Sequence, residues 1–276
     1  MKFTKYILPP IIYNFLLFLK NLFIFSVSSR DEILNKNNFL KTKKNNKRAF
    51  LIATGPSLKL ENLNLLKNED CFTISNAFLL KEINIIKPIL HFFAPYHEPI
   101  TKKSFIKWLN KCDKQLPLKT DIVMNYDDRE LINKNLFKNR NIFFLKISDK
   151  INLFHINLIK PIPKFQTGSL MVLPVLMNMG YKKIYLLGCD HNQLKNFNST
   201  IENFYDEKND PRKTKKNKLN SHFLKLDKEL KASLNVYQQY KEYGKIAQKL
   251  NIDIINLSKN SWLDLFKKDL LKNVIK

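Results

Sequence analysis

From residue 49 onward, short apolar runs alternate with longer segments in which apolar residues recur every three or four positions. The short runs predict strands and the longer segments predict helices. Because strands that alternate with helices form parallel sheets covered on both faces, we expect one α/β domain over 49–276. The predicted strands are 49–54, 71–75, 88–94, 121–126, 141–147, 182–188 and 252–257.

The intervening segments predict helices, and glycine and proline mark their limits. Gly180 is a stop signal for an apolar helix that starts at 167, and Pro174 should kink that helix or lie in its early turns. The acidic residues of "YDDRE" (126–130) suit the first turn of a helix, so we interpret them as structural. The other predicted helices are 55–66, 76–86, 100–112 and 226–250.

Three segments lie outside this alternation. Residues 191–222 are polar without periodicity, and loops of this length are usually functional lids or disordered, so we expect a lid. Residues 28–48 are polar and basic and predict a linker. The apolar run in 1–27 is interrupted by prolines, asparagines and Lys20, which favours an amphipathic helix in the head-group plane of a membrane. A helix packed on the domain and a true span or signal remain alternatives.

Composition adds a charge argument. The formal net charge of +24 suggests an anionic partner such as lipid head groups, nucleotide phosphates or nucleic acid, although the lysines form no single tract. The chain lacks a recognisable nucleic-acid-binding module, so we expect no nucleic-acid partner. Cys71, Cys112 and Cys189 are too scattered for a disulfide framework, which favours buried thiols in a reducing cytoplasm.

Four of the five glycines lie in two short regions, "ATGPSL" (53–58) and "QTGSLMVLPVLMNMGYKKIYLLGCDHN" (166–192). Gly55 and Gly188 directly follow predicted strands, and ligands of parallel sheets bind where such loops lead into helices. We therefore expect the backbone N–H groups after Gly55, with Ser57 at a helix start, to face an anion. The motif is neither G-x-G-x-x-G nor a P-loop. The two regions should converge on one nucleotide cleft.

The blocks "FLIATGPSL…FTISNAF" and "KFQTGSLMVLPVLMNMGYKKIYLLGCDHN", with the tail "NSHFLKLDKEL…SWLDLF", resemble the bacterial family 42 sialyltransferases. They resemble still more a group from surface-polysaccharide and flagellin-glycosylation loci, which is related to the archaeal 6-hydroxymethylpterin pyrophosphokinases. The resemblance spans about 48–266. It implies a Rossmann-like, mostly parallel α/β sheet with helices on both faces and an inverting, metal-independent glycosyltransferase without a cofactor. The donor would be a CMP-activated acidic sugar, and the acceptor a cell-surface glycan or glycolipid.

The resemblance also implies roles for individual residues. Thr54 stands where the sialyltransferases keep an Asn, Asn76 matches a sugar-contacting Asn, and Asn192 replaces a phosphate-binding Tyr. Lys164 stands where they carry an Arg, which keeps the charge without the bidentate geometry. The implied donor-binding residues are Thr54, Gly55, Pro56, Ser57, Asn76, Gln166, Thr167, Gly168, Ser169, Asp190 and Asn192.

Histidines are the candidates for the general base, because a neutral imidazole can accept the proton of an acceptor hydroxyl. The sialyltransferases place their catalytic His in a Gly-His-Ser motif beyond a Ser-His-aromatic motif, and this sequence keeps only the latter, at His222. Both His222, which ends the lid, and His191, at a strand end, remain candidates. His97 is better placed for acceptor contact. His91 is expected in the core, and Tyr205, Arg212, Lys213 and Lys215 of the lid could neutralise the leaving group.

An ATP-dependent diphosphotransferase like the pterin enzymes is the alternative function. It would require Mg²⁺ and therefore carboxylates near Asp190, which the sequence lacks; no D-x-D follows a strand, and the acidic and His residues lack ligand spacing. We expect no metal site. The basic surface and N-terminal segment suit a peripheral location on the inner, cytoplasmic face of the cell membrane. Association into a homo-oligomer stays open.

Overall fold

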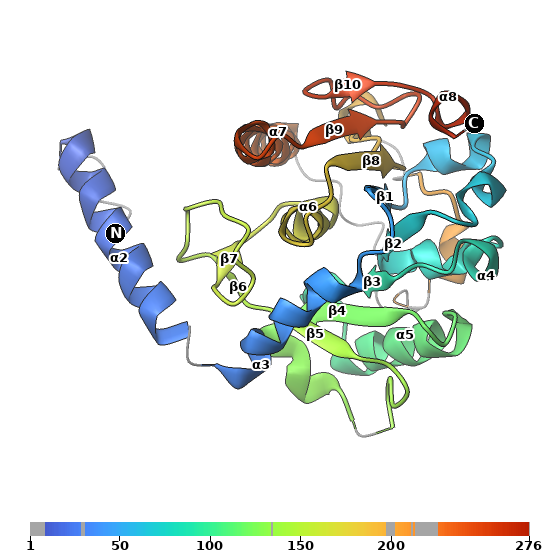
Figure 1. Cartoon of the computed structure of the whole chain (residues 1–276), viewed down its shortest axis with the longest axis horizontal. Coiled ribbons are helices and arrows are strands. Elements are labelled where there is room, and N and C mark those ends of the chain that lie inside the picture. Colours follow the sequence, from blue (N-terminus) through green and yellow to red (C-terminus); the bar gives the residue numbers. More distant parts are fainter. Residues whose placement is uncertain are drawn as a thin grey trace.

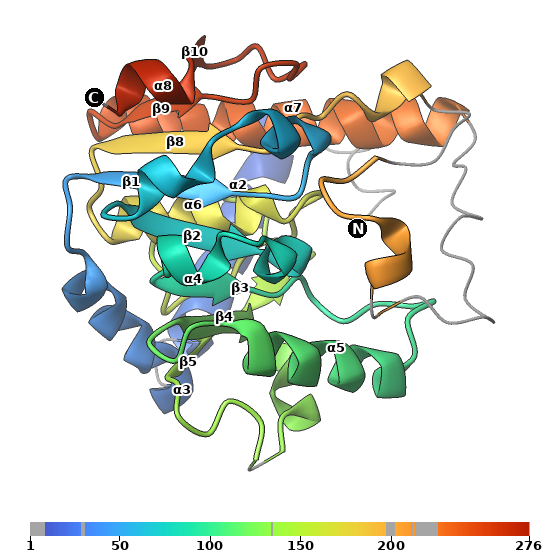
Figure 2. The same cartoon turned by 90° about the vertical axis from the view of Figure 1, so that its right-hand side faces the viewer.

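The computed structural model describes residues 9–28, 31–133, 135–196, 202–210, 212 and 226–275. Its centre is an eight-stranded sheet in the order β10-β9-β8-β1-β2-β3-β4-β5, which can be followed from top to bottom in Figure 2. The predicted parallel α/β sheet is confirmed, because every strand pair in the sheet is parallel. The strands are β1 (Arg48–Ile52), β2 (Asp70–Ile74), β3 (Leu90–Phe92), β4 (Asp121–Asn125), β5 (Ile142–Leu145), β8 (Lys183–Leu187), β9 (Asp253–Asn256) and β10 (Lys267–Lys268).

The order of the strands reverses between β1 and β8. The chain runs outward from β1 through β2, β3 and β4 to β5, then crosses to the other side of β1, where β8, β9 and β10 follow. Residues 48–52 of β1 pair in register with 183–187 of β8. Ligands of open parallel sheets bind outside the carboxyl ends of the two strands that flank such a reversal. Gly55 and Gly188 both lie just beyond those ends.

Helices cover both faces of the sheet (Figure 1). The alternation along β1 determines which side chains reach which layer. Ala49 and Leu51 belong to the core that includes α6 (Ser169–Asn178) and α7 (Leu226–Lys249), and Phe50 and Ile52 belong to the core on the other face. The helices of that second face are α4 (Ile83–Ile86), α5 (Lys102–Gln115) and α8 (Leu271–Val274). The thiols of Cys71, Cys112 and Cys189 are free and buried.

The helices predicted at 55–66 and 76–86 are mostly wrong. The first is two 3₁₀ helices, Pro56–Leu60 and Leu63–Leu66, and the second is a 3₁₀ helix, Ser75–Leu79, followed by the one-turn α4. Asn62 uses its side chain to cap the backbone of Asn64, which competes with continuous helix. The 126–130 segment is also 3₁₀ (Tyr126–Leu131), and Asp128 accepts the backbone N–H of Tyr96. Helix α6 contains Pro174 and ends before Gly180, whose φ is +85°.

The prediction of a linker at 28–48 is wrong for its described part. A short helix α3 (Glu32–Asn35) and a 3₁₀ helix (Lys36–Lys43) pack on the sheet and bury Leu34 and Leu40. The buried Asn37 amide donates to the carbonyls of Phe144 and Leu158 at 2.8 Å each. The segment therefore belongs to the folded domain, because Leu34 and Leu40 are both buried and Leu40 is part of the core on the α6 side of the sheet.

Helix α2 (Pro10–Ser28) lies to the side of the domain, near the two-stranded ribbon β6 (Ile147–Ser148) and β7 (Ile162–Pro163) in Figure 1. Asn21 of α2 donates a hydrogen bond to Asn152 at 3.0 Å. Among the residues that the structure describes, none of the helices combines the length and apolarity required to span a bilayer.

Candidate functional site

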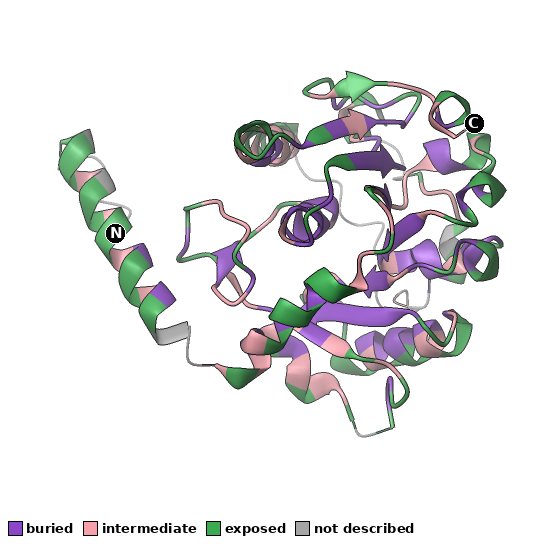
Figure 3. Cartoon of the chain, in the orientation of Figure 1, coloured by how far each residue is buried: buried purple, intermediate pink, exposed green. Residues whose placement is uncertain are grey.

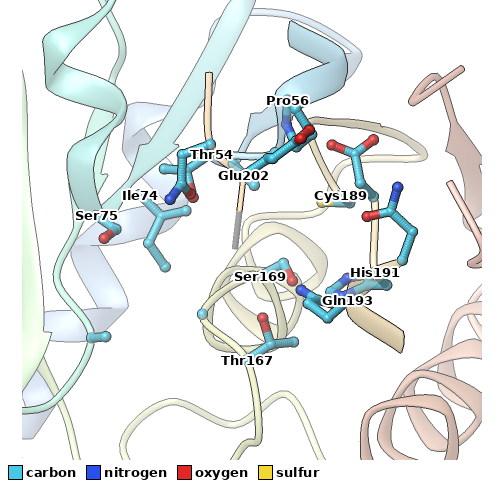
Figure 4. A pocket seen from close by; sticks show the side chains of 18 residues that line it. Thr54, Pro56, Ile74, Ser75, Thr167, Ser169, Cys189, His191, Gln193 and Glu202 are labelled. Carbon is cyan, nitrogen blue, oxygen red and sulfur yellow. The ribbon is translucent and has the colours of Figure 1, made fainter. Parts of the chain in front are cut away.

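A pocket of about 230 Å³ opens where β1 and β8 end (Figure 4). Most of its lining comes from the turn after β1, the start of α6 and the residues after β8, and Ile74, Ser75, Ala94, Glu202 and Asn203 complete it. The structure thus brings together most of the residues predicted from the sequence. The predicted residues that line the pocket are Thr54, Gly55, Pro56, Thr167, Gly168, Ser169, Asp190, His191 and Asn192.

The carboxylate of Asp190 accepts a backbone hydrogen bond from the turn after β1. The Gly55 N–H donates to the Gly188 carbonyl at 2.9 Å, and the buried Ser57 donates its N–H to Asp190 Oδ2 at 3.1 Å. A Cβ on residue 55 would overlap the Asp190 carboxylate and lie 2.5 Å from the Gly188 carbonyl oxygen. The expectation that the N–H groups after Gly55 face a bound anion is wrong for this structure, because Asp190 accepts the N–H of Ser57 and the Gly55 carbonyl accepts that of Leu58.

Asp190 has one carboxylate oxygen in use and one available. It lines the pocket and is 4% exposed, and Oδ1 has no hydrogen-bond partner among the described residues. Burial raises the pKa of this carboxyl above its usual range, and hydrogen bonds from Ser57 offset part of that effect. A buried polar atom without a partner is costly, so a donor from a ligand or a water molecule in the pocket would stabilise Oδ1. Ribose hydroxyls and base amino groups are donors of this kind.

A backbone site for an anion lies across the pocket, at the N-terminus of α6. The Leu170 and Met171 N–H groups bond to the carbonyls of Thr167 and Gly168, whereas the N–H groups of Gly168 and Ser169 have no acceptor among the described residues. The first turn of a helix carries partial positive charge, which attracts phosphate or carboxylate groups. The sequence analysis placed the anion subsite after Gly55, whereas the N–H groups available to an anion in the structure are those of Gly168 and Ser169.

His191 lines the pocket, and its side chain contacts Tyr240 of α7. Its Nε2 is 2.8 Å from the Tyr240 hydroxyl, which is 2.6 Å from the Ser169 hydroxyl. Burial lowers the pKa of His191 to about 4, so the imidazole is neutral at physiological pH. With Nε2 engaged by Tyr240, Nδ1 is the ring nitrogen that can accept a proton from a substrate.

Two residues of the pocket have strained backbones. Ser75 and His191, both lining residues, have φ values of +58° and +48°, in the left-handed region that side chains other than glycine rarely adopt. Such conformations cost about 1–3 kcal/mol and are found most often where a side chain must point in one direction for function. At His191 the conformation directs the ring onto Tyr240.

Helix α7 also positions the segment that leads into α6. Gln239 accepts the N–H of Gln166 at 2.8 Å and donates to the Lys164 carbonyl at 2.9 Å. Gln166 lies outside the main pocket, in an adjoining groove against α7 that shares Thr167 and His191 with it. The oxygen and the nitrogen of this one side-chain amide therefore both hold the backbone just before the pocket.

Two predicted contact residues lie elsewhere. Asn76 is fully buried beneath α5, where its Oδ1 accepts the indole N–H of Trp108 at 2.7 Å, so it does not line the pocket. Its predicted contact with the donor sugar is wrong for this structure. His97 is exposed and lies outside the pocket lining, with Nδ1 2.9 Å from the Glu98 carbonyl. His91 is in the core as expected, and burial lowers its pKa to about 3.

The described part of the predicted lid is docked on the domain. The Phe204 N–H donates to the Thr54 carbonyl at 3.1 Å, and Glu202 and Asn203 line the pocket. Arg212 forms an ion pair with the buried Asp210, and its guanidinium lies 4.8 Å from the Trp108 ring. This guanidinium faces Asp210 and does not line the pocket. His222, Lys213 and Lys215 lie outside the described residues.

The described lining contains Asp190 and Glu202 but neither lysine nor arginine. Within the described ranges, no three His, Cys, Asp or Glu side chains are grouped closely enough to hold a metal ion. Metal independence stays a prediction, and the positive end of α6 is the feature of this pocket that suits an anion.

A scan of protein-family models finds no match, and a search of curated proteins finds no significant match. A search of solved structures finds sialyltransferases of Campylobacter jejuni, the class of enzyme that the sequence motifs resemble. CstII in complex with CMP-3FNeuAc has a TM-score of 0.45 and 17% identity, covering 84% of this chain and 88% of that chain. The monofunctional α-2,3-sialyltransferase Cst-I has a TM-score of 0.47 and 15% identity, covering 84% and 83%. Similarity this weak carries no argument about chemistry, which rests on the pocket itself.

Sequence reasoning missed Tyr240 and Ser75. Tyr240 lies in "VYQQYKEYG", where tyrosines recur on the apolar side of an amphipathic helix, and such a pattern indicates packing. Only the fold shows that its hydroxyl reaches His191. Ser75 directly follows β2, just as the glycine loops follow β1 and β8. Its position at a strand end was therefore the signal in the sequence that could have indicated a place in the pocket.

Proposed function

We propose that this protein is a sialyltransferase-like glycosyltransferase, which transfers an acidic sugar from a CMP-activated donor to a hydroxyl of a glycan acceptor. The observation that carries the proposal is the pairing, in one pocket at the reversal of strand order, of the unsatisfied Asp190 Oδ1 with the free N-terminus of α6. A nucleotide sugar supplies both complementary groups, namely hydroxyl or amino donors and an anion. Parts of the sequence motifs that resemble sialyltransferases, namely residues 54–56, 167–169 and 190–192, line this pocket.

In the proposed reaction His191 is the general base. Its Nδ1 takes the proton of the acceptor hydroxyl while that oxygen forms a bond to the anomeric carbon of the donor. The bond between the anomeric carbon and the phosphate oxygen breaks, and its electron pair leaves with CMP. With Nε2–H donating to Tyr240, and Tyr240 donating to Ser169, the resulting imidazolium is stabilised through atoms that are already within 2.8 Å and 2.6 Å.

The α6 N-terminus supports the departing phosphate or the carboxylate of the sugar, since both develop or carry negative charge. Attack by the acceptor on the face opposite the phosphate inverts the anomeric centre. No step in this scheme requires a metal ion, because the proton goes to His191 and the charge is met by backbone N–H groups.

Calorimetric titration with CMP, CDP and ATP, each with and without Mg²⁺, tests the proposal. We expect CMP to bind without metal and Thr167→Trp, which fills the pocket, to abolish the heat. Thr42→Trp, at an exposed threonine outside the pocket, serves as the matched control and should bind CMP normally. Binding of ATP that depends on Mg²⁺, without binding of CMP, would overturn the proposal in favour of the diphosphotransferase alternative.

A further inference from the structure

Helix α2 presents a continuous apolar face to solvent. Eight large apolar side chains are each between 44% and 79% exposed. They form two adjacent rows along the helix, each with spacings of four, three and four residues, so the rows cover a broad arc of one side. The rows are Ile11, Phe15, Phe18 and Leu22, and Ile12, Leu16, Leu19 and Phe23.

The side of α2 that contacts the domain carries its polar anchor. The buried Asn21 donates to Asn152 at 3.0 Å, and Phe25 packs edge-on against His155 with ring centroids 5.0 Å apart. The Lys160 ammonium lies 5.1 Å from the centre of the Phe25 ring. Surface helices of globular proteins place the apolar side inward and the polar side outward. Helix α2 instead leaves eight large apolar side chains exposed, and Figure 3 shows it as a mostly exposed helix beside the domain.

We propose that this face of α2 inserts into the interfacial region of an anionic lipid bilayer. The arc is two rows wide, whereas a seam between two helices uses a single narrow stripe, so its width suits a bilayer better than a second copy of the chain. The charge is complementary, because Pro10–Ser28 contains Lys20 and no acidic residue, and the chain carries a formal net charge of +24. Apolar insertion and attraction to anionic head groups then act together.

The inference is independent of the chemistry in the pocket, and co-sedimentation of the full-length chain with vesicles tests it. We expect the chain to sediment with vesicles that contain phosphatidylglycerol and much less with phosphatidylcholine alone. The double variant Phe15→Glu/Phe18→Glu should weaken binding at least tenfold. Because both side chains are exposed, this variant should keep its far-UV circular dichroism and its response to CMP.

The matched control is Leu60→Glu/Leu118→Glu, which adds the same charge at two exposed leucines of the domain. Because these two positions lie away from α2, the control should bind vesicles within twofold of wild type. Equal loss in both double variants would show that net charge alone controls binding and would overturn the proposal. So would a wild-type chain that stays in the supernatant, or a dimer in light scattering that the α2 variant dissociates.

Discussion

At the scale of single residues, the Asp190 carboxylate determines the conformation of the turn after β1. It accepts the Ser57 N–H and occupies the space above Gly55, where no side chain fits. The glycine in "TGPSL" is therefore required by close approach of a carboxylate from a neighbouring strand end. Its φ is −64°, a value that any residue adopts, so steric contact and not backbone strain demands glycine.

Gly55→Ala should destabilise the fold and prevent nucleotide binding. The added Cβ would overlap Asp190 and force the carboxylate or the turn to move, at a cost of about 1–3 kcal/mol. Urea unfolding and CMP titration measure the two effects. Gly244→Ala is the matched control, because this glycine lies within α7 and its Cβ would meet only Phe266 at 3.4 Å. That variant should be more stable by about 0.5–1 kcal/mol; equal losses in both would contradict the steric explanation.

Tyr240→Phe should lower the turnover number at least tenfold and leave the KM for the CMP-sugar donor unchanged. The hydroxyl that it removes is the partner of His191 Nε2, so the imidazolium formed during transfer loses its stabilisation. Release of CMP in the presence of donor and acceptor measures both constants. Tyr243→Phe, one helical turn away in the same core, is the control for packing. If both variants had the same turnover number, Tyr240 would have only a structural role.

At the scale of elements, α7 connects the two halves of the pocket. Tyr240 faces His191 after β8, and Gln239 holds the backbone before α6. The helix is therefore more than a cover for the sheet, because consecutive residues on it orient two different walls of the site.

Gln239→Leu should weaken CMP binding about tenfold, which corresponds to about 1.4 kcal/mol. The substitution removes both hydrogen bonds to the Lys164–Gln166 backbone, so the turn at 167–169 loses its restraint. Stability should change by no more than about 1 kcal/mol, since the side chain is only half-buried. Gln238→Leu, at the exposed neighbouring position, should bind CMP as wild type does; a matching loss there would contradict the role of Gln239.

Asn37→Ala tests whether the segment before β1 is part of the domain. One buried and one partly buried backbone carbonyl would lose their donor, and we expect the free energy of unfolding to fall by about 1–3 kcal/mol. Denaturant unfolding measures it. Asn38→Ala, at the adjacent exposed asparagine, should change stability by less than about 0.5 kcal/mol. A linker, as expected from composition, would show no difference between the two variants.

At the scale of the whole molecule, buried neutral histidines make stability depend on pH. Burial lowers the pKa of His191 to about 4 and that of His91 to about 3, whereas both histidines bind protons near pH 6.5 in the unfolded chain. Between those values the unfolded state holds more protons, so stability falls as pH falls. Burial raises the pKa of Asp128 and Asp190, and these carboxyls act in the opposite direction.

We expect the free energy of unfolding of wild type to decrease from pH 7 to pH 4, and His191→Gln to decrease by about 3 kcal/mol less over that range. The variant lacks the histidine whose protonation favours the unfolded state. Denaturant titrations at each pH measure both curves. Parallel curves for the two proteins would show that His191 titrates normally in the folded state.

The sequence by itself determined the alternation of strands and helices, the parallel sheet, and the two glycine regions at strand ends. These features depend on near neighbours along the chain, because periodicity, proline and glycine act locally. The sequence did not distinguish 3₁₀ helix from α-helix in the segments after β1 and β2, because the two conformations have similar local patterns. It also did not show that residues 31–43 are folded, because this polar, basic stretch contains only a few core residues.

Only the tertiary structure decided which groups meet. Ser57 and Asp190 are 133 positions apart in the chain, and His191 and Tyr240 are 49 apart, so no local pattern records either contact. The order of the strands brings the ends of β1 and β8 together, and packing of α7 on α6 brings the tyrosine to the histidine. This packing determines the hydrogen-bond partners in a buried site, because a buried polar group can bond only to donors and acceptors that the fold brings within about 3 Å of it.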